Sequence, residues 1–124
     1  RCFIALVLAL LCPGLSGAAE ERSSPSAQLA VLADEFYVAR ARFDPLHYAT
    51  ANGDSRYDDQ VGMSIAPKAR DEHFAHMHRL RSRLAKIPRA ALSDAEQLNR
   101  DILAFELDSS LDLEQFPEHL LPIH

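Results

Sequence analysis

The chain has 124 residues, a formal net charge of −5 at pH 7, two cysteines and four glycines. This length suits one ordinary domain and is too short for two. An acidic balance repels phosphate backbones and anionic lipid, so nucleic-acid binding is disfavoured. So few glycines exclude a phosphate-cradling loop, a nucleotide fingerprint and the elbow of a serine nucleophile.

An apolar run from Cys2 to Cys12 opens the chain. It is shorter than the roughly 20 residues that span a bilayer, and it has the length of a signal-peptide core. Pro13-Gly14 and small residues follow, as they do before a signal-peptidase site. We therefore predict a signal peptide over 1–19 and a periplasmic or secreted protein. A buried helix, a membrane anchor and a lipid anchor at Cys12 are the alternatives.

Cleavage of this signal would remove both cysteines, and with them any disulfide, thiolate zinc site or thiol nucleophile. It would also remove Arg1 and no acidic residue, so the net charge would become −6. No membrane segment would remain. The polar stretch 20–26 predicts a linker, and 27–124 is predicted to be the N-terminal helical segment of a larger domain.

A first helix is predicted from about Ala27 to Arg42, because apolar residues recur there at helical spacing. Asp44-Pro45 ends it and begins a short turn. Asn52-Gly53 tolerates positive φ and ends that turn. The segment 54–60 has no periodicity and is predicted to be a loop. The apolar face consists of Leu29, Leu32, Phe36 and Phe43.

Two further helices are predicted to form an antiparallel hairpin. Pro67 begins one that runs to about Ile87, and Pro88 ends it. Ser93 and Glu96 form a capping box for another that runs to about Glu114. The short connection between them favours antiparallel neighbours. The core-facing stripe of the earlier helix is Phe74, Met77, Leu80, Leu84 and Ile87.

The last helix has a wide apolar face that needs covering from two sides. One stripe is Leu98, Ile102 and Phe105, and beside it lie Leu103, Leu107 and Leu111. The predicted fold is therefore all-α, an N-terminal helix plus an antiparallel helical hairpin, and incomplete. Basic and acidic residues should face each other across the hairpin as weak, solvated pairs. They are Arg79, Arg81, Arg83, Lys86 and Arg89 on one side and Asp94, Glu96 and Asp101 on the other.

The densest group of potential metal ligands is Glu72, His73, His76 and His78. The zinc-protease helix needs two histidines four apart with a glutamate after the first, and this segment lacks that pattern. We predict a solvated helix face, with His78 turned towards the apolar stripe. The sequence accordingly predicts no metal ligand and no catalytic residue in this chain.

The loop 54–60 contains the candidate substrate-binding residues. Its acids Asp54, Asp58 and Asp59 do not have the spacing of a calcium loop, and turn formation and capping explain them better. Arg56 and Tyr57 are predicted to meet a substrate carboxylate or peptide, since arginine pairs with carboxylates in a bidentate manner. The alternative is a loop that packs on a neighbouring helix.

The order of four segments resembles the N-terminal region of the bacterial domain-of-unknown-function family 885. They are DPLHYAT at 44–50, GDSRYDD at 53–59, LS and LN within 92–99, and FPEHLLPI at 116–123. The resemblance implies an exported, mostly helical protein several times longer, similar to zinc-dependent oligopeptidases and carboxypeptidases. Peptides would be its substrates, and this chain would pack against the missing C-terminal part.

In such relatives the zinc helix has a His-Glu pair followed by a Pro-Gly-His-His segment, and no position here matches it. The resemblance therefore implies zinc and peptide hydrolysis for the longer parent protein and no catalytic role for this chain alone. The alternative is a complete small helical binding module of the periplasm, in which six histidines would serve as metal or ligand contacts. A purely structural or interaction domain is the third possibility.

Overall fold

The computed structural model describes residues 24–62 and 64–117. Within these ranges it contains helices and turns and no strand, so the predicted all-α class is confirmed. The predicted signal peptide and residues 20–23 of the predicted linker lie outside the described residues. The helices are α1 (Pro25–Phe43), α2 (Pro45–Tyr48), α3 (Pro67–Ala85) and α4 (Asp94–Asp112), with short 3-10 turns η1 (Thr50–Asn52), η2 (Ser55–Tyr57), η3 (Arg89–Ala91) and η4 (Leu113–Gln115).

Helix α1 begins at Pro25, two residues before the predicted start. The Ser24 hydroxyl accepts a hydrogen bond of 3.2 Å from the Ala27 amide, and Pro25 occupies the first helical position. Serine and proline are the residues preferred at these two positions. Residues 24–26 therefore form the start of the helix, and the predicted linker is wrong over this part.

The other helix ends follow the predicted signals closely. Pro67 begins α3, which ends at Ala85, although Ile87 beyond it is still buried. Helix α4 has the predicted capping box, in which the Ser93 amide donates to the Glu96 carboxylate at 2.8 Å. It ends at Asp112, and η4 continues the turn. Gly53 adopts φ 79° at the end of η1, as the predicted stop requires.

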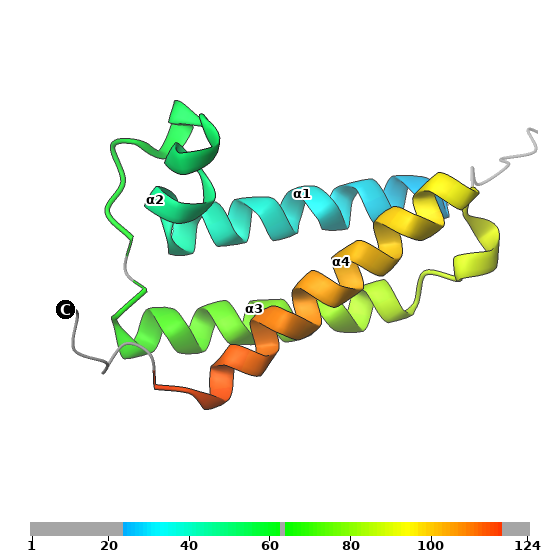
Figure 1. The fold of residues 1–124 in the computed structure, drawn as a ribbon. Coiled ribbons are helices and arrows are strands. Elements are labelled where there is room, and N and C mark those ends of the chain that lie inside the picture. Colours follow the sequence, from blue (N-terminus) through cyan, green and yellow to red (C-terminus); the bar gives the residue numbers. More distant parts are fainter. Residues whose placement is uncertain (1–23, 63, 118–124) are drawn as a thin grey trace, which may run out of the picture.

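Figure 1 shows α1 and α3 running side by side in opposite directions, with α4 returning obliquely across α3. The predicted antiparallel hairpin of α3 and α4 is therefore present. Helix α2 and the turns η1 and η2 form a small lobe at the C-terminal end of α1 (Figure 1). The start of α3 and the end of α4 lie near this lobe.

The main core lies between the three long helices. Side chains from each of them, and from the connection between α3 and α4, are almost fully buried there, namely Leu29, Leu32, Phe36, Met77, Leu80, Leu84, Ile87, Leu92, Leu103 and Leu107. A second, small cluster of Ala41, Ala49 and Tyr57 joins the α2 lobe to α1. Of the predicted α1 face, Phe43 lies outside the core.

The two predicted stripes of α4 have different surroundings. Leu103 and Leu107 are 7% and 1% exposed, and Leu111 packs against the core. Leu98, Ile102 and Phe105 are 60%, 51% and 68% exposed. The three long helices thus cover one side of the apolar face and leave the other open, beside the groove between α1 and α4.

The predicted charge pairing across the hairpin is right for Arg89, which contacts Asp101 at 3.1 Å, and wrong in other details. Arg81 pairs with Asp108 at 2.6 Å, because α4 crosses α3 obliquely and brings a later turn opposite. Arg83 binds Glu35 of α1 instead. Glu96 is occupied by its own cap. Among the described residues, no helix is long and apolar enough to cross a membrane.

Candidate functional site

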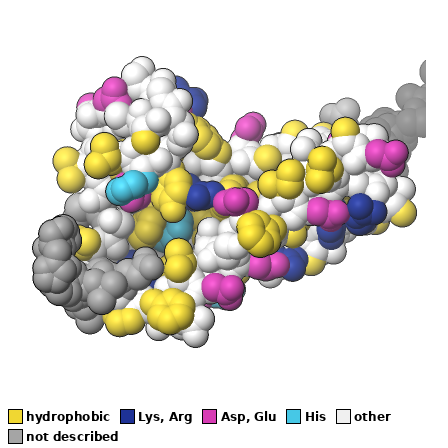
Figure 2. Space-filling view, in the orientation of Figure 1, with side chains coloured by type: hydrophobic (Ala, Val, Ile, Leu, Met, Phe, Trp, Pro, Cys, Tyr) yellow, Lys and Arg dark blue, Asp and Glu magenta, His cyan; other side chains and the backbone are white. Residues whose placement is uncertain are grey.

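A cleft of about 230 Å³ lies where the α2 lobe, the start of α3 and the end of α4 meet. In Figure 2 hydrophobic, basic, acidic and histidine side chains gather around this hollow. Aromatic rings, two arginines, one histidine, one aspartate and two serines share one concave surface. Such a mixture of apolar and polar side chains is the usual character of a small-molecule site. The lining residues are Arg40, Phe43, Asp44, Tyr48, Ser64, Ile65, Arg70, His73, Phe74, Ser110 and Leu113.

Arg40 extends from the last turn of α1 and is fixed by rings and by one ion pair. Its guanidinium carbon lies 4.0 Å from the ring centroid of Tyr48 and 5.0 Å from that of Phe36. Its Nη1 donates to the Glu106 carboxylate at 2.8 Å, which joins α1 to α4. Its Nε is buried and has no hydrogen-bond partner within the described residues. Stacking and one carboxylate thus restrict this side chain to one orientation.

Arg70 lies in the first turn of α3. Its Nη2 donates to the backbone carbonyl of Phe116 at 3.0 Å, and that of Leu113 lies at 3.5 Å. Its guanidinium carbon is 4.9 Å from the ring centroid of Phe74. Among the described residues no carboxylate lies within ion-pair distance of it. The carbonyls fix its position, and its positive charge has no anionic partner there.

His73 lies between the two arginines and is half-buried. Its ring stacks on Phe43, with centroids 3.9 Å apart, and meets the edge of Phe74. Burial, with smaller contributions from His76, Arg40 and Arg70, lowers the pKa of His73 to about 4. It is therefore neutral at pH 7, able to donate one hydrogen bond and accept another. The predicted solvated helix face is wrong for this residue.

The other residues of that histidine and glutamate group point in different directions. His78 is exposed, with its Nε2 2.8 Å from the Glu114 carboxylate, so the prediction that it turns towards the apolar stripe is wrong. Glu72 is exposed and lies 3.7 Å from Lys68. Burial lowers the pKa of His76. Within the described ranges there is no group of three or more histidine, cysteine, aspartate or glutamate residues that could bind a metal ion.

The carboxylate in the cleft lining, Asp44, is directed to the start of α2. It accepts from the His47 amide at 3.3 Å, and its other oxygen lies 2.8 Å from the His47 ring. It therefore caps α2 and contacts a histidine instead of either arginine of the cleft. The charged residues of the lining are thus two arginines and one aspartate, and Arg40 is also paired with Glu106.

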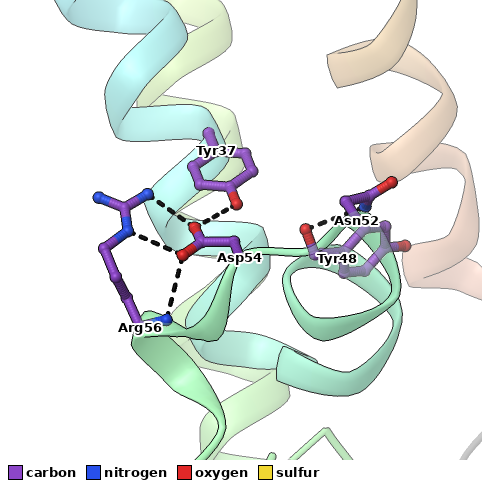
Figure 3. A network of polar contacts seen from close by, with 5 residues as sticks. All are labelled: Tyr37, Tyr48, Asn52, Asp54 and Arg56. Atoms are coloured by element: carbon purple, nitrogen blue, oxygen red, sulfur yellow. Dashed lines mark hydrogen bonds and ion pairs between the residues drawn. The ribbon is translucent and has the colours of Figure 1, made fainter.

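The predicted substrate-binding residue Arg56 forms a bidentate pair with Asp54 (Figure 3). The same carboxylate accepts from the Arg56 amide at 3.1 Å and from the Tyr37 hydroxyl at 2.5 Å. These hydrogen bonds, from Arg56 first and then Tyr37, hold the pKa of Asp54 well below its usual range. Asn52 nearby donates to the Tyr48 carbonyl at 3.2 Å.

The other predicted substrate-binding residue, Tyr57, is buried against Ala41 and Ala49. Asp58 accepts from the Thr50 hydroxyl at 2.7 Å. The 54–60 segment thus closes on itself and packs on α1, which is the alternative that the sequence left open. Neither Arg56 nor Tyr57 lines the cleft. The predicted role of this pair in substrate binding stays a prediction.

Sequence reasoning missed Arg40 and Arg70. Arg70 carries a usable signal, because a cation in the first turn of a helix opposes the helix dipole and so suggests a tertiary role. Arg40 has no comparable signal, since its neighbours in space come from three separate helices. No protein-family model, curated protein or solved structure matches this sequence.

Proposed function

We propose that this chain is the N-terminal helical part of an exported zinc-dependent peptidase. The order of the motifs between residues 44 and 123 supports this proposal through their resemblance to the family 885 proteins. The zinc ligands and the general base would lie in a His-Glu and Pro-Gly-His-His segment of the longer protein. Within the described ranges of this chain there is no group of three or more histidine, cysteine, aspartate or glutamate residues that could bind a metal ion, and we assign none of them to the zinc site.

The observation that carries the proposal is the open apolar stripe of α4. Leu98, Ile102 and Phe105 lie on successive turns and are more than half exposed. Exposing such a row is unfavourable, by roughly 1.5–3 kcal/mol for each large side chain that could otherwise be buried. A further helical layer over α1 and α4 would bury this row, as a larger helical peptidase requires.

The experiment is to read the gene beyond the codon for His124 and to express the whole open reading frame. A frame that encodes the His-Glu and Pro-Gly-His-His segment, followed by bound zinc and hydrolysis of oligopeptides, supports the proposal. The change Phe105→Ser should then destabilise the long protein and leave this chain alone almost unaffected. A stop codon directly after His124 overturns the proposal.

The cleft favours a second candidate, a small exported helical binding module. A peptidase segment that serves only as scaffold has no need of an arginine such as Arg70, which has no carboxylate partner among the described residues, in a concave, aromatic site. This candidate expects the chain of 124 residues, freed of its signal, to be a folded monomer that binds a small ligand. Aggregation of that chain at neutral pH would contradict it.

A further inference from the structure

We propose that the cleft between the α2 lobe, the start of α3 and the end of α4 binds a small organic carboxylate, with the anion on Arg70 and an apolar body among the rings of Phe43, Tyr48 and Phe74. The inference rests on the cleft alone. It holds whether the chain functions inside a peptidase or as a separate binding module.

The charges around the cleft favour an anion. Arg70 is fixed by two carbonyl oxygens, which are neutral acceptors, and no carboxylate of the described residues forms an ion pair with it. Arg40 shares its charge with Glu106. Asp44 is hydrogen-bonded at the start of α2 and forms no ion pair with either arginine. An arginine without a carboxylate partner in a partly buried site is suited to a ligand carboxylate.

The walls of the cleft favour a carboxylate with an apolar body over a bare inorganic anion. Phe43 is stacked with His73, Phe74 lies under Arg70, and all four side chains line the cleft, so aromatic surface borders the cation. The neutral imidazole of His73 and the hydroxyls of Ser64 and Ser110 can complete the hydrogen bonds of one carboxylate. A phosphate would leave the apolar part of the lining in contact with water.

The size of the cleft limits the ligand to a small molecule. A cavity of about 150 Å³ accommodates one benzene ring. The 230 Å³ here therefore has room for a ring or a branched aliphatic chain together with one carboxylate. A nucleotide or a folded peptide is too large. The site is open to solvent, so we expect modest affinity, with a dissociation constant on the order of 1 mM for a simple probe.

The probe is benzoate, and benzamide is its neutral match of nearly the same shape. We would titrate each into the chain with its signal removed and follow amide chemical shifts by NMR. Benzoate should shift the amides of Phe43, His73 and Ser110, and benzamide should bind at least about tenfold more weakly, because a charge-assisted pair is lost. No saturable shift with benzoate, or equal binding of the two probes, overturns the proposal.

The variant Arg70→Gln should weaken benzoate binding by about tenfold or more and leave benzamide binding unchanged. Arg79→Gln is the matched control, because Arg79 is exposed on the same helix, does not line the cleft, and hydrogen-bonds His76. Equal loss of benzoate binding in both variants would mean a diffuse charge effect and would contradict the proposal. The comparison of the two probes on the unaltered chain remains decisive even if Arg70→Gln loosens the end of α4.

Inorganic phosphate distinguishes this site from a general anion site. Phosphate should not displace benzoate at equal concentration, because it gains nothing from the rings. Displacement at equal concentration would overturn the assignment to an organic carboxylate. The benzoate and phosphate titrations do not depend on the gene sequence beyond His124. A failure of the carboxylate proposal can therefore be distinguished from a failure of the peptidase proposal.

Discussion

The imidazole of His73 lies nearly parallel to the phenyl ring of Phe43, with centroids 3.9 Å apart and planes inclined by 12°. This stack joins the end of α1 to the start of α3 and forms one wall of the cleft. Protonation of the imidazole would place a charge in a half-buried site beside Arg40 and Arg70. Burial and these charges lower the pKa of His73 to about 4.

The first prediction concerns the stability of the chain in mild acid. Between pH 6.5 and about 4 the unfolded histidine takes up a proton and the folded one does not, so the free energy of unfolding should fall as the pH drops. We expect a loss on the order of 1 kcal/mol between pH 7 and 5, after allowing for solvent screening at this half-buried site. Urea denaturation at both pH values measures it.

The variant His73→Gln should remove most of this pH dependence, because glutamine does not titrate. His76, whose pKa is also lowered, should contribute a smaller effect of the same sign. Acids with lowered pKa values, such as Glu35, lose their stabilising effect at lower pH, below about 4.5, and so do not interfere. If the free energy of unfolding of His73→Gln still fell with pH as steeply as that of the unaltered chain, the burial of this imidazole would be contradicted.

The second prediction compares two neighbouring residues of α4. Leu103 is 7% exposed in the core, and Ile102 is 51% exposed on the open stripe. Leu103→Ala should lower the free energy of unfolding by about 2–5 kcal/mol, and Ile102→Ala by no more than about 0.5 kcal/mol. Thermal and urea denaturation of this chain test both. Similar losses in the two variants would mean that the open stripe is covered in solution. The free energy of unfolding would then depend on protein concentration.

Most of the helical framework could be predicted from the sequence, because it depends on local signals. Pro67, the Ser93 and Glu96 capping box and Gly53 act through their own backbone neighbourhoods, and each marks a helix end in the structure. Ser24-Pro25 is an equally local signal. The polar residues around it favour a linker and so hide this signal.

The cleft could not be predicted in the same way, because it depends on tertiary placement. The periodicity of α3 does place His73 on the buried face, four, seven and eleven residues before Met77, Leu80 and Leu84, and places His78 away from it. The stacking of His73 on Phe43 of α1 is what depends on tertiary placement. Which of the two α4 stripes enters the core likewise depends on the crossing angle of the helices. The guanidinium of Arg56 suits a substrate carboxylate, and this is why the sequence favours it as a binding residue. In the structure Asp54, two residues before it, already forms the bidentate pair.

The third prediction concerns the network in the α2 lobe. The Tyr37 hydroxyl donates to Asp54, and this hydrogen bond, together with burial and the negative charge, raises the pKa of Tyr37. The variant Asp54→Asn should lower the pKa of Tyr37 towards its ordinary value. Ultraviolet titration of the phenols measures this, and Tyr37→Phe identifies which of the three tyrosines is responsible. Thr50→Val, which removes the separate contact with Asp58, is the control. An unshifted titration in Asp54→Asn would contradict the network.

The last prediction concerns the close approach of Gly62 to the end of α1. A Cβ atom at this position would lie 2.8 Å from the Cδ of Pro45 and 2.9 Å from the carbonyl oxygen of Phe43. Gly62→Ala should therefore displace the segment that leads to Ser64 and Ile65 in the cleft, at a cost of about 1–3 kcal/mol. Gly53→Asn is the control, since asparagine tolerates the positive φ and nothing lies within 4 Å of that position. Denaturation measures the loss of stability, and a weaker benzoate titration in Gly62→Ala but not in Gly53→Asn would show that this contact shapes the cleft.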